Sequence, residues 1–149
     1  MDHVVYMDTG EGELKKLLNG SKRMIIRGAN GRKLPYGRVQ AGDRLFFIQN
    51  DGKCEVRASA KVTMVINSDK LSEEEARQLL DVNQEKLLLS QAQIKRWVGK
   101  RYLVLIGIEE ASLLPAFVID RSEYGNMDDW LPVGDISRVK KSFQDPNHP

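Results

Sequence analysis

Two apolar runs on either side of a short turn sequence constrain the fold of this chain more than any other feature. The first run is RLFFIQ, residues 44–49, and the second is CEVRASAKVTMVI, residues 54–66. From Val56 to Met64 apolar residues alternate with polar ones, which is the period of a strand with one buried face. Between the runs lies Asn50-Asp51-Gly52, whose residue types tolerate the positive φ angles of a tight turn. The segment therefore predicts a β-hairpin.

Upstream of this hairpin the sequence predicts a strand, a helix, a second strand and a loop. HVVYM (3–7) and RMIIR (23–27) are short apolar runs typical of strands. Between them, GELKKLLNG has leucines at helical spacing and ends at Gly20, a residue type that commonly terminates helices. The glycines and proline of GANGRKLPYG (28–37) cannot continue a strand and predict a loop.

Downstream of the hairpin we expect two helices and then further strands. Ser72 and Glu75 form a capping-box pattern for a helix over 72–88, and Ser90 begins a second helix that ends at Gly99. RYLVLIGIEE (101–110) predicts a buried strand and PAFVID (115–120) predicts another. Because most of these strands lack crossover helices between them, the sheet should be mainly antiparallel. The expected fold is α+β, a barrel-like sheet with flanking and inserted helices.

The length of 149 residues predicts one domain, since a chain of this size can bury a substantial core. We expect this domain to span residues 1–140, with a helical insertion at about 71–99 and a frayed polar tail, 141–149. A membrane-spanning helix needs about 18 apolar residues, and no apolar run in the sequence approaches that length. The N-terminus also lacks a basic region followed by a long apolar one, so we expect a cytoplasmic protein with no membrane partner.

Metal and cofactor chemistry is not expected. Cys54 is the only cysteine, and the two histidines, His3 and His148, lie at opposite ends of the chain. We expect Cys54 to be a buried strand residue. Asp128 and Asp129 are adjacent, and carboxylates that are neighbours in sequence rarely converge on one bond, so the pattern does not predict a carboxylate-pair hydrolase.

Positive charge is concentrated between Lys15 and Arg44, where nine basic residues accompany a single acid, Asp43, although the net charge of the chain is only +2. Such a patch attracts phosphates. Within it, Gly28 and Gly31 can bring backbone N–H groups close to an anion because glycine has no Cβ. The polar side chains around these glycines are Arg27, Asn30, Arg32 and Lys33. An ordinary strand connection with solubilising charges is the alternative, and the Gly-Lys-Ser/Thr end of a P-loop is missing.

Three aromatic residues, Tyr36, Tyr124 and Trp130, lie beside turn residues. Loop aromatics can stack on an unpaired base, which typically contributes about 1 to 3 kcal/mol for each base. Trp97 lies with Ile94 on the second predicted helix, and we expect it to be a core residue.

The segments NGSKRMIIR and GRVQAGDRLFFI resemble the ASCH and related PUA-like domains, EVE-like relatives included. The family signature is a glycine, any residue, lysine, two residues, an acid or threonine, one residue and arginine. It falls on Gly20, Lys22, Ile25 and Arg27, and three of these four positions match. The resemblance covers about residues 4–66 and, less specifically, the strand at 100–110. It implies a small β-barrel with flanking helices that handles RNA or modified nucleobases.

In PUA-like proteins that recognise modified bases, aromatic residues sandwich the base while a polar side chain reads its edge. By this resemblance Tyr124 or Trp130 would stack on the base, and Asn126 or Asp129 would hydrogen-bond to it. The alternative is that Trp130 closes the end of the barrel.

These observations predict a nucleic-acid-binding module. Its expected partner is RNA or another single-stranded nucleic acid, or a modified nucleotide. The expected binding cleft is lined by Lys22, Arg27, Arg32, Lys33 and Arg38. An alternative is an amidohydrolase, because some bacterial ASCH proteins hydrolyse acetylcytidine with the lysine, a threonine and a glutamate. The threonine position here is Ile25, which has no hydroxyl to activate. A third possibility is a protein-interaction domain that uses the acidic helix from Ser72.

Overall fold

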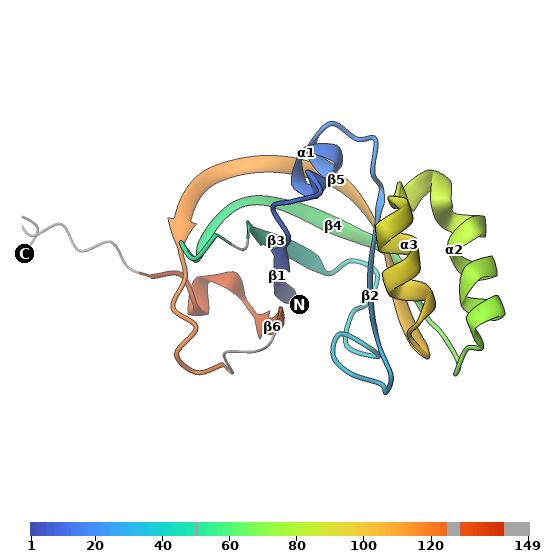
Figure 1. Ribbon diagram of the computed structural model, residues 1–149. Helices are drawn as coiled ribbons and strands as arrows, with labels where there is room; N and C mark the ends of the chain where they lie inside the picture. Colours follow the sequence, from blue (N-terminus) through green and yellow to red (C-terminus); the bar gives the residue numbers. More distant parts are fainter. Residues whose placement is uncertain (50, 125–128, 142–149) are drawn as a thin grey trace, which may run out of the picture.

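The computed structural model describes residues 1–49, 51–124 and 129–141. In these ranges a strongly curved sheet carries three α-helices and one short 3-10 helix (Figure 1). The elements are β1 (Asp2–Met7), α1 (Glu13–Leu18), β2 (Met24–Ala29), β3 (Arg44–Gln49), β4 (Glu55–Asn67), α2 (Glu73–Leu87), α3 (Gln91–Val98), β5 (Tyr102–Val118), β6 (Trp130–Gly134) and η1 (Ile136–Arg138). None of the helices among the described residues is long and apolar enough to cross a membrane.

The six strands form one sheet in the order β2-β5-β4-β3-β1-β6. β1 pairs with β3 in parallel, and the other neighbouring strands are antiparallel. The prediction of an α+β, barrel-like and mainly antiparallel fold is confirmed. The predicted hairpin is also present as β3 and β4, and Gly52 in its turn has a φ of 81°. Asn50, the first residue of the predicted turn, lies outside the described residues.

Two local predictions were wrong. The segments 101–110 and 115–120 are not separate strands, because β5 runs without a break from Tyr102 to Val118. Pro115 lies at an irregularity in the pairing of β5 with β4. Between the pairs Val56↔Phe117 and Ala58↔Leu113, three residues of β5, 114–116, lie opposite the single residue Arg57. Proline, which has no N–H to donate, is tolerated at such an interruption of the ladder. Cys54 is half-buried with a φ of 52° and precedes β4, so it is a turn residue rather than a buried strand residue.

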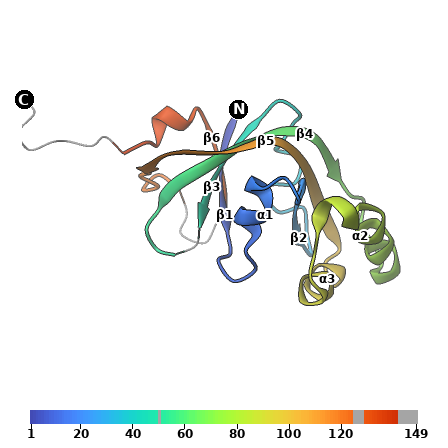
Figure 2. The same cartoon turned by 90° about the horizontal axis from the view of Figure 1, so that it is seen from above.

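β2 is buried on both faces, which explains why its sequence is a continuous apolar run. Ile25 faces the core inside the curve of the sheet, together with α1, whereas Met24 and Ile26 face a second core under α2 and α3. Figure 2 shows this division: α1 lies within the curve, and α2 and α3 lie together beyond β2 and β5. β5 divides its side chains in the same way, with Val104 facing the inner core and Leu103 facing the helices.

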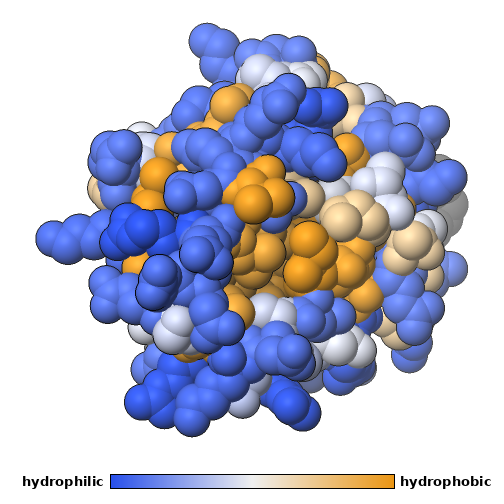
Figure 3. Space-filling model, turned by 90° about the vertical axis from the view of Figure 1, so that its right-hand side faces the viewer, coloured by the Kyte–Doolittle hydropathy of each residue, from blue (hydrophilic) through white to orange (hydrophobic). Residues whose placement is uncertain are grey.

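The inserted helices begin as predicted. The predicted capping box of Ser72 with Glu75 is formed on α2, and the structure adds a second one, Ser90 with Gln93, on α3. On the side of the molecule that carries these helices, hydrophilic side chains surround a central hydrophobic patch (Figure 3). Val82 of α2 is 82% exposed, the largest exposed fraction among the large hydrophobic residues that the structure describes.

Candidate nucleic-acid interface

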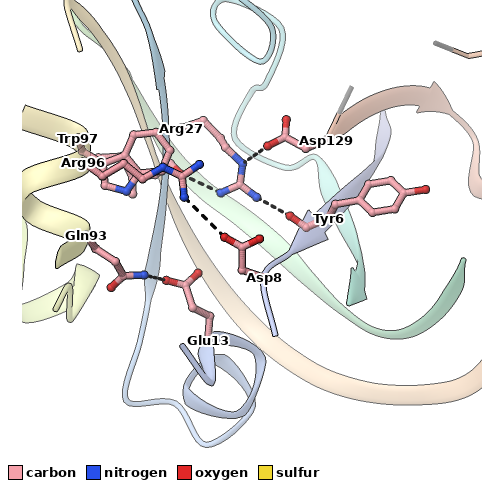
Figure 4. A pocket seen from close by; sticks show the side chains of 9 residues that line it. Tyr6, Asp8, Glu13, Arg27, Gln93, Arg96, Trp97 and Asp129 are labelled. Atoms are coloured by element: carbon pink, nitrogen blue, oxygen red, sulfur yellow. Dashed lines mark hydrogen bonds and ion pairs between the residues drawn. The ribbon is translucent and has the colours of Figure 1, made fainter. Parts of the chain in front are cut away.

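Arg27 lies where the two edges of the curved sheet meet. Its guanidinium Nη2 donates a hydrogen bond to the Tyr6 carbonyl oxygen on β1 at 2.7 Å, and Nη1 donates to the Ile26 carbonyl at 2.8 Å. Its Nε is 3.3 Å from Oδ2 of Asp129 (Figure 4). Its guanidinium also lies 5.8 Å from the ring centroid of Trp130 on β6. β2 and β6 are the two edge strands of the sheet and are not neighbours in the strand order. The Arg27 side chain therefore connects the two edges of the sheet.

The Arg27 side chain is only 13% exposed. Burial away from water lowers the pKa of its guanidinium, and the nearby Asp129 carboxylate opposes that effect. Even so, arginine stays protonated in proteins, so the buried charge needs the carbonyl and carboxylate partners that surround it. Arg27 therefore has a structural role, because its guanidinium is bound to protein oxygens in the absence of any ligand.

A pocket of about 140 Å³ lies beside Arg27. It is lined by Tyr6, Asp8, Glu13, Ile26, Arg27, Gln93, Arg96, Trp97 and Asp129. An engineered cavity of about 150 Å³ is known to hold benzene, so this pocket has room for one aromatic ring but not for a whole nucleotide. Trp97 and Ile26 give it apolar walls, and carboxylates, guanidinium groups and an amide give it polar ones.

Trp97 can pack closely on β2 because Gly28 has no side chain. A Cβ at Gly28 would lie 2.7 Å from Cδ2 of Leu103 and 3.2 Å from Cε3 of Trp97. Packing under α3 thus explains this glycine, which lies inside β2 and not in the loop as the sequence hypothesis had it. Trp97 is 7% exposed, which confirms the prediction that it is a core residue.

Glu13, the first residue of α1, is held at one wall of the pocket by two donors. Gln93 Nε2 donates to Glu13 Oε1 at 2.5 Å, and Lys22 Nζ lies 3.6 Å from the same oxygen. The capping box orients the Gln93 amide, because its Oε1 accepts from the Ser90 backbone N–H at 2.9 Å. In the part of the chain that the structure describes, Glu13 Oε2 accepts no hydrogen bond.

Lys22 is 1% exposed and does not line the pocket. Its Nζ donates to the carbonyl oxygen of Leu87, at the end of α2, where the helix itself leaves carbonyls unpaired. Burial lowers the pKa of this amine, and the Glu13 carboxylate opposes the shift. Lys22 therefore fastens the inserted helices to the barrel. Ile25, at the threonine position of the signature, is fully buried in the inner core.

The loop from residue 30 to 43 is fixed on the ends of β4 and β5. Tyr36 Oη donates to the Ser68 carbonyl oxygen at 2.5 Å, and the Gly37 backbone N–H donates to Asn67 Oδ1 at 2.9 Å. The ring of Tyr36 meets the ring of Tyr102 edge to face, with centroids 5.8 Å apart. Arg32 lies 5.7 Å from both centroids. The result is an anchored surface that is both basic and aromatic.

The predicted basic residues divide into two groups. Arg32, Lys33 and Arg38 are exposed in the loop, as is Asn30, whereas Lys22 and Arg27 are buried and bound to protein oxygens. The five predicted cleft residues therefore do not line one open surface. The loop follows the pocket strand directly in the chain, since it begins after Ala29, two positions beyond Arg27, and Ala29 pairs with Tyr102.

Trp130 is fully buried and donates from Nε1 to Nδ1 of His3 at 3.1 Å. His3 Nε2 is in turn 2.9 Å from Oδ2 of Asp43. Because the indole N–H can only donate, Nδ1 must accept, and Nε2 carries the proton that is donated to Asp43. Burial lowers the pKa of His3, which favours this neutral form. The burial of Trp130 favours the alternative that it closes the end of the barrel over stacking on a base.

The remaining predicted site residues have different positions. Asp129 is exposed and lines the pocket through its ion pair with Arg27. Tyr124 is half-buried and packs on a separate core that includes Val4 and Phe46, away from the pocket. Asn126, Asp128 and His148 lie outside the described residues. Within the described ranges, the histidine, cysteine and acidic side chains form no group that could hold a metal ion.

Several pocket residues were missed by sequence reasoning: Asp8, Glu13, Gln93 and Arg96. The sequence predicted that a helix begins at Ser90, but no local pattern indicated the partner of Gln93, because Glu13 is 80 positions away in the chain. Arg96 and Asp8 likewise meet across the pocket, 3.5 Å apart, from α3 and the end of β1. Only the tertiary structure brings these side chains together.

No protein-family model matches the sequence, and no curated protein sequence matches it. Solved structures do match. The ASCH protein from Zymomonas mobilis superposes with a TM-score of 0.66 at 12% identity, over 94% of this chain and 96% of that chain. A tyrosine-to-phenylalanine variant of that protein gives 0.66 at 12% identity over 94% and 99%, and a serine-to-alanine variant gives 0.66 at 14% over 92% and 92%.

The chain therefore has an ASCH-like fold, and the expectation from the sequence resemblance is confirmed at this level. At 12–14% identity the likeness defines the fold and not the ligand.

Proposed function

We propose that this protein binds single-stranded RNA or a nucleotide with a modified base, with one unpaired base in the pocket beside Arg27 and the phosphate backbone on the loop 30–43. The observation that carries the proposal is that a pocket with room for one ring lies beside Arg27 on β2, and that an exposed basic loop follows β2 directly in the chain. A nucleotide supplies both a ring for the pocket and phosphates for the basic loop, whereas a metabolite without phosphates would leave the loop unused. This agrees with what the ASCH resemblance implies.

The division between base and phosphate follows from the charges. Among the described residues, three carboxylates and two guanidinium groups line the pocket, and each guanidinium is already near a carboxylate. A phosphate would be repelled there. In the loop, by contrast, Arg32, Lys33 and Arg38 have no ion-pair partner in the part of the chain that the structure describes. Their charges are available for a backbone.

The amidohydrolase alternative has less support. Lys22 would have to leave the Leu87 carbonyl and Glu13 before it could reach a substrate, and Ile25 offers no nucleophile. Release of acetate from an acetylated cytidine by the purified protein would nevertheless revive it.

The test is fluorescence anisotropy with a labelled single-stranded RNA at several salt concentrations. We expect log affinity to fall with log salt concentration, by about 0.7 for each phosphate contact. Arg32→Ala and Lys33→Ala should weaken binding to all sequences alike and flatten this slope. Lys53→Ala, a charge removal in the β3–β4 turn, is the matched control and should change neither. Affinity that does not depend on salt would contradict the proposal.

A further inference from the structure

Glu13 differs from the other two carboxylates of the pocket. Asp129 lies 3.3 Å from Arg27 and Asp8 lies 3.5 Å from Arg96, so both face guanidinium groups. Among the described residues Glu13 forms no ion pair with an arginine, and the contacts from Gln93 and Lys22 are made to its Oε1. Its Oε2 accepts no hydrogen bond from the described residues, and the side chain is 14% exposed and lines the pocket.

We infer that Glu13 makes this pocket selective for an unpaired base that carries an exocyclic amine. This inference rests on the proposed function, in which one base enters the pocket. It adds which edge of the base is read and by which residue.

The position of Glu13 Oε2 is set by the neighbours of Oε1. Gln93 cannot turn its amide around without losing the hydrogen bond from the Ser90 backbone, and Lys22 is anchored on Leu87. The carboxylate is thus held from two sides by groups that are themselves fixed. A reading group that is fixed in advance loses little entropy when the ligand binds, which favours specificity.

An ionised carboxylate can only accept hydrogen bonds. An amine on the base would donate to Oε2, as carboxylates do when they accept from N4 of cytosine. A carbonyl in the same place would turn its lone pairs toward the negative charge, and neither group could donate. Arg27 is held in its place by the Ile26 and Tyr6 carbonyls and by Asp129, so its guanidinium does not replace Glu13 as the group that faces the base edge. A uracil placed in the same way as cytosine should therefore bind more weakly.

The two 12-mers rC12 and rU12 are matched probes for this inference. They have the same number of phosphates and the same ring size, and at position 4 of the ring they differ between an amine and a carbonyl. We expect wild type to bind rC12 about tenfold more tightly than rU12, which corresponds to about 1.4 kcal/mol. In Glu13→Gln the ratio should fall close to one, because an amide can either donate or accept. The salt slope should stay unchanged, since the phosphates bind elsewhere.

Glu74→Gln is the matched control, because it removes the same charge from an exposed position in the first turn of α2. It should keep the wild-type ratio. Gln93→Ala is a second variant that leaves the Glu13 charge in place and removes the donor that holds it, and it should lower the ratio in part. If Glu13→Gln does not fold, the ratio of rC12 to rU12 affinity in wild type and in Gln93→Ala still tests the role of Glu13.

The outcomes separate the two proposals. Equal wild-type affinity for rC12 and rU12, with a normal salt slope, would overturn the role of Glu13 and leave RNA binding intact. An unchanged preference in folded Glu13→Gln would do the same. Failure of wild type to bind either probe would overturn the proposed function, and this inference with it.

Discussion

Trp130 and His3 are 127 positions apart in the chain, and the indole N–H of Trp130 donates to Nδ1 of His3 in the buried interior. The hydrogen bond fixes which nitrogen of the imidazole carries its proton. It also makes protonation costly, because a second N–H on His3 would point at the indole N–H.

The first prediction is therefore a loss of stability in mild acid. The pKa of His3 is lowered in the folded protein, chiefly by burial, so the unfolded chain binds a proton at a higher pH than the folded one. Asp43 and Asp2 oppose this shift and the N-terminal amine adds to it. The contribution of neutral His3 to the free energy of unfolding should be fully present above about pH 6.5, the ordinary histidine pKa. It should be lost as the pH falls from there toward the lowered pKa of the folded protein.

Urea unfolding at half-unit intervals between pH 5 and 8 measures this effect. His3→Gln removes the titrating ring, so its unfolding free energy should change less over that range even though it starts lower. An equally steep loss in His3→Gln would assign the acid sensitivity to other groups.

The second prediction concerns the contact between the sheet edges. Arg27→Ala should lower the free energy of unfolding by about 2 to 4 kcal/mol, because it removes charged hydrogen bonds to two backbone carbonyls and the partner of Asp129. Arg27→Lys should recover little, since an ammonium cannot reproduce the planar fork. Arg23, which is half-exposed and 3.8 Å from Glu85, is the control. Arg23→Ala should cost under about 1 kcal/mol.

The third prediction tests the packing of Trp97 on β2. Gly28→Ala should destabilise by about 1 to 3 kcal/mol, because the new Cβ would overlap Leu103 and crowd Trp97. Gly31→Ala adds the same atom where nothing lies within 4 Å and should change stability by no more than about 0.5 kcal/mol. Thermal unfolding of both variants gives the comparison. Equal effects would mean that the close approach at Gly28 is not a constraint.

The fourth prediction separates a structural Lys22 from a catalytic one. Lys22→Met should cost about 2 to 3 kcal/mol, because the Leu87 carbonyl loses its donor in a buried place. Hydrogen exchange should accelerate in the last turn of α2, while the exposed Lys86→Met should leave it unchanged. A folded Lys22→Met with wild-type stability would show that the amine is held for a purpose other than fastening the helices.

Local patterns accounted for most of the secondary structure. The turn at Gly52, the capping box at Ser72 and the helix start at Ser90 are decided by neighbours within a few residues, and each was predicted from the sequence. Pro115 misled because a register irregularity, which lies in the pairing with β4 and not in the local sequence, accommodates it.

The candidate site was predictable only in part. The exposed charges of the loop followed from composition, since a basic glycine-containing segment has few ways to be buried. The pocket depends instead on Glu13 meeting Gln93, and on Arg27 reaching across to the other edge of the sheet. Trp130 looked like a loop aromatic because its neighbours are turn residues, yet β6 pairs with β1 and carries it into the core.

The division of β2 and β5 between two cores has a consequence for how the molecule unfolds. Neighbouring residues such as Val104 and Leu103 belong to the barrel and to the helical layer respectively, on the same piece of backbone. Neither layer can melt without exposing one side of strands that the other needs, so the two should behave as one cooperative unit. A chain cut down to its barrel would present a bare sheet face to water and should self-associate.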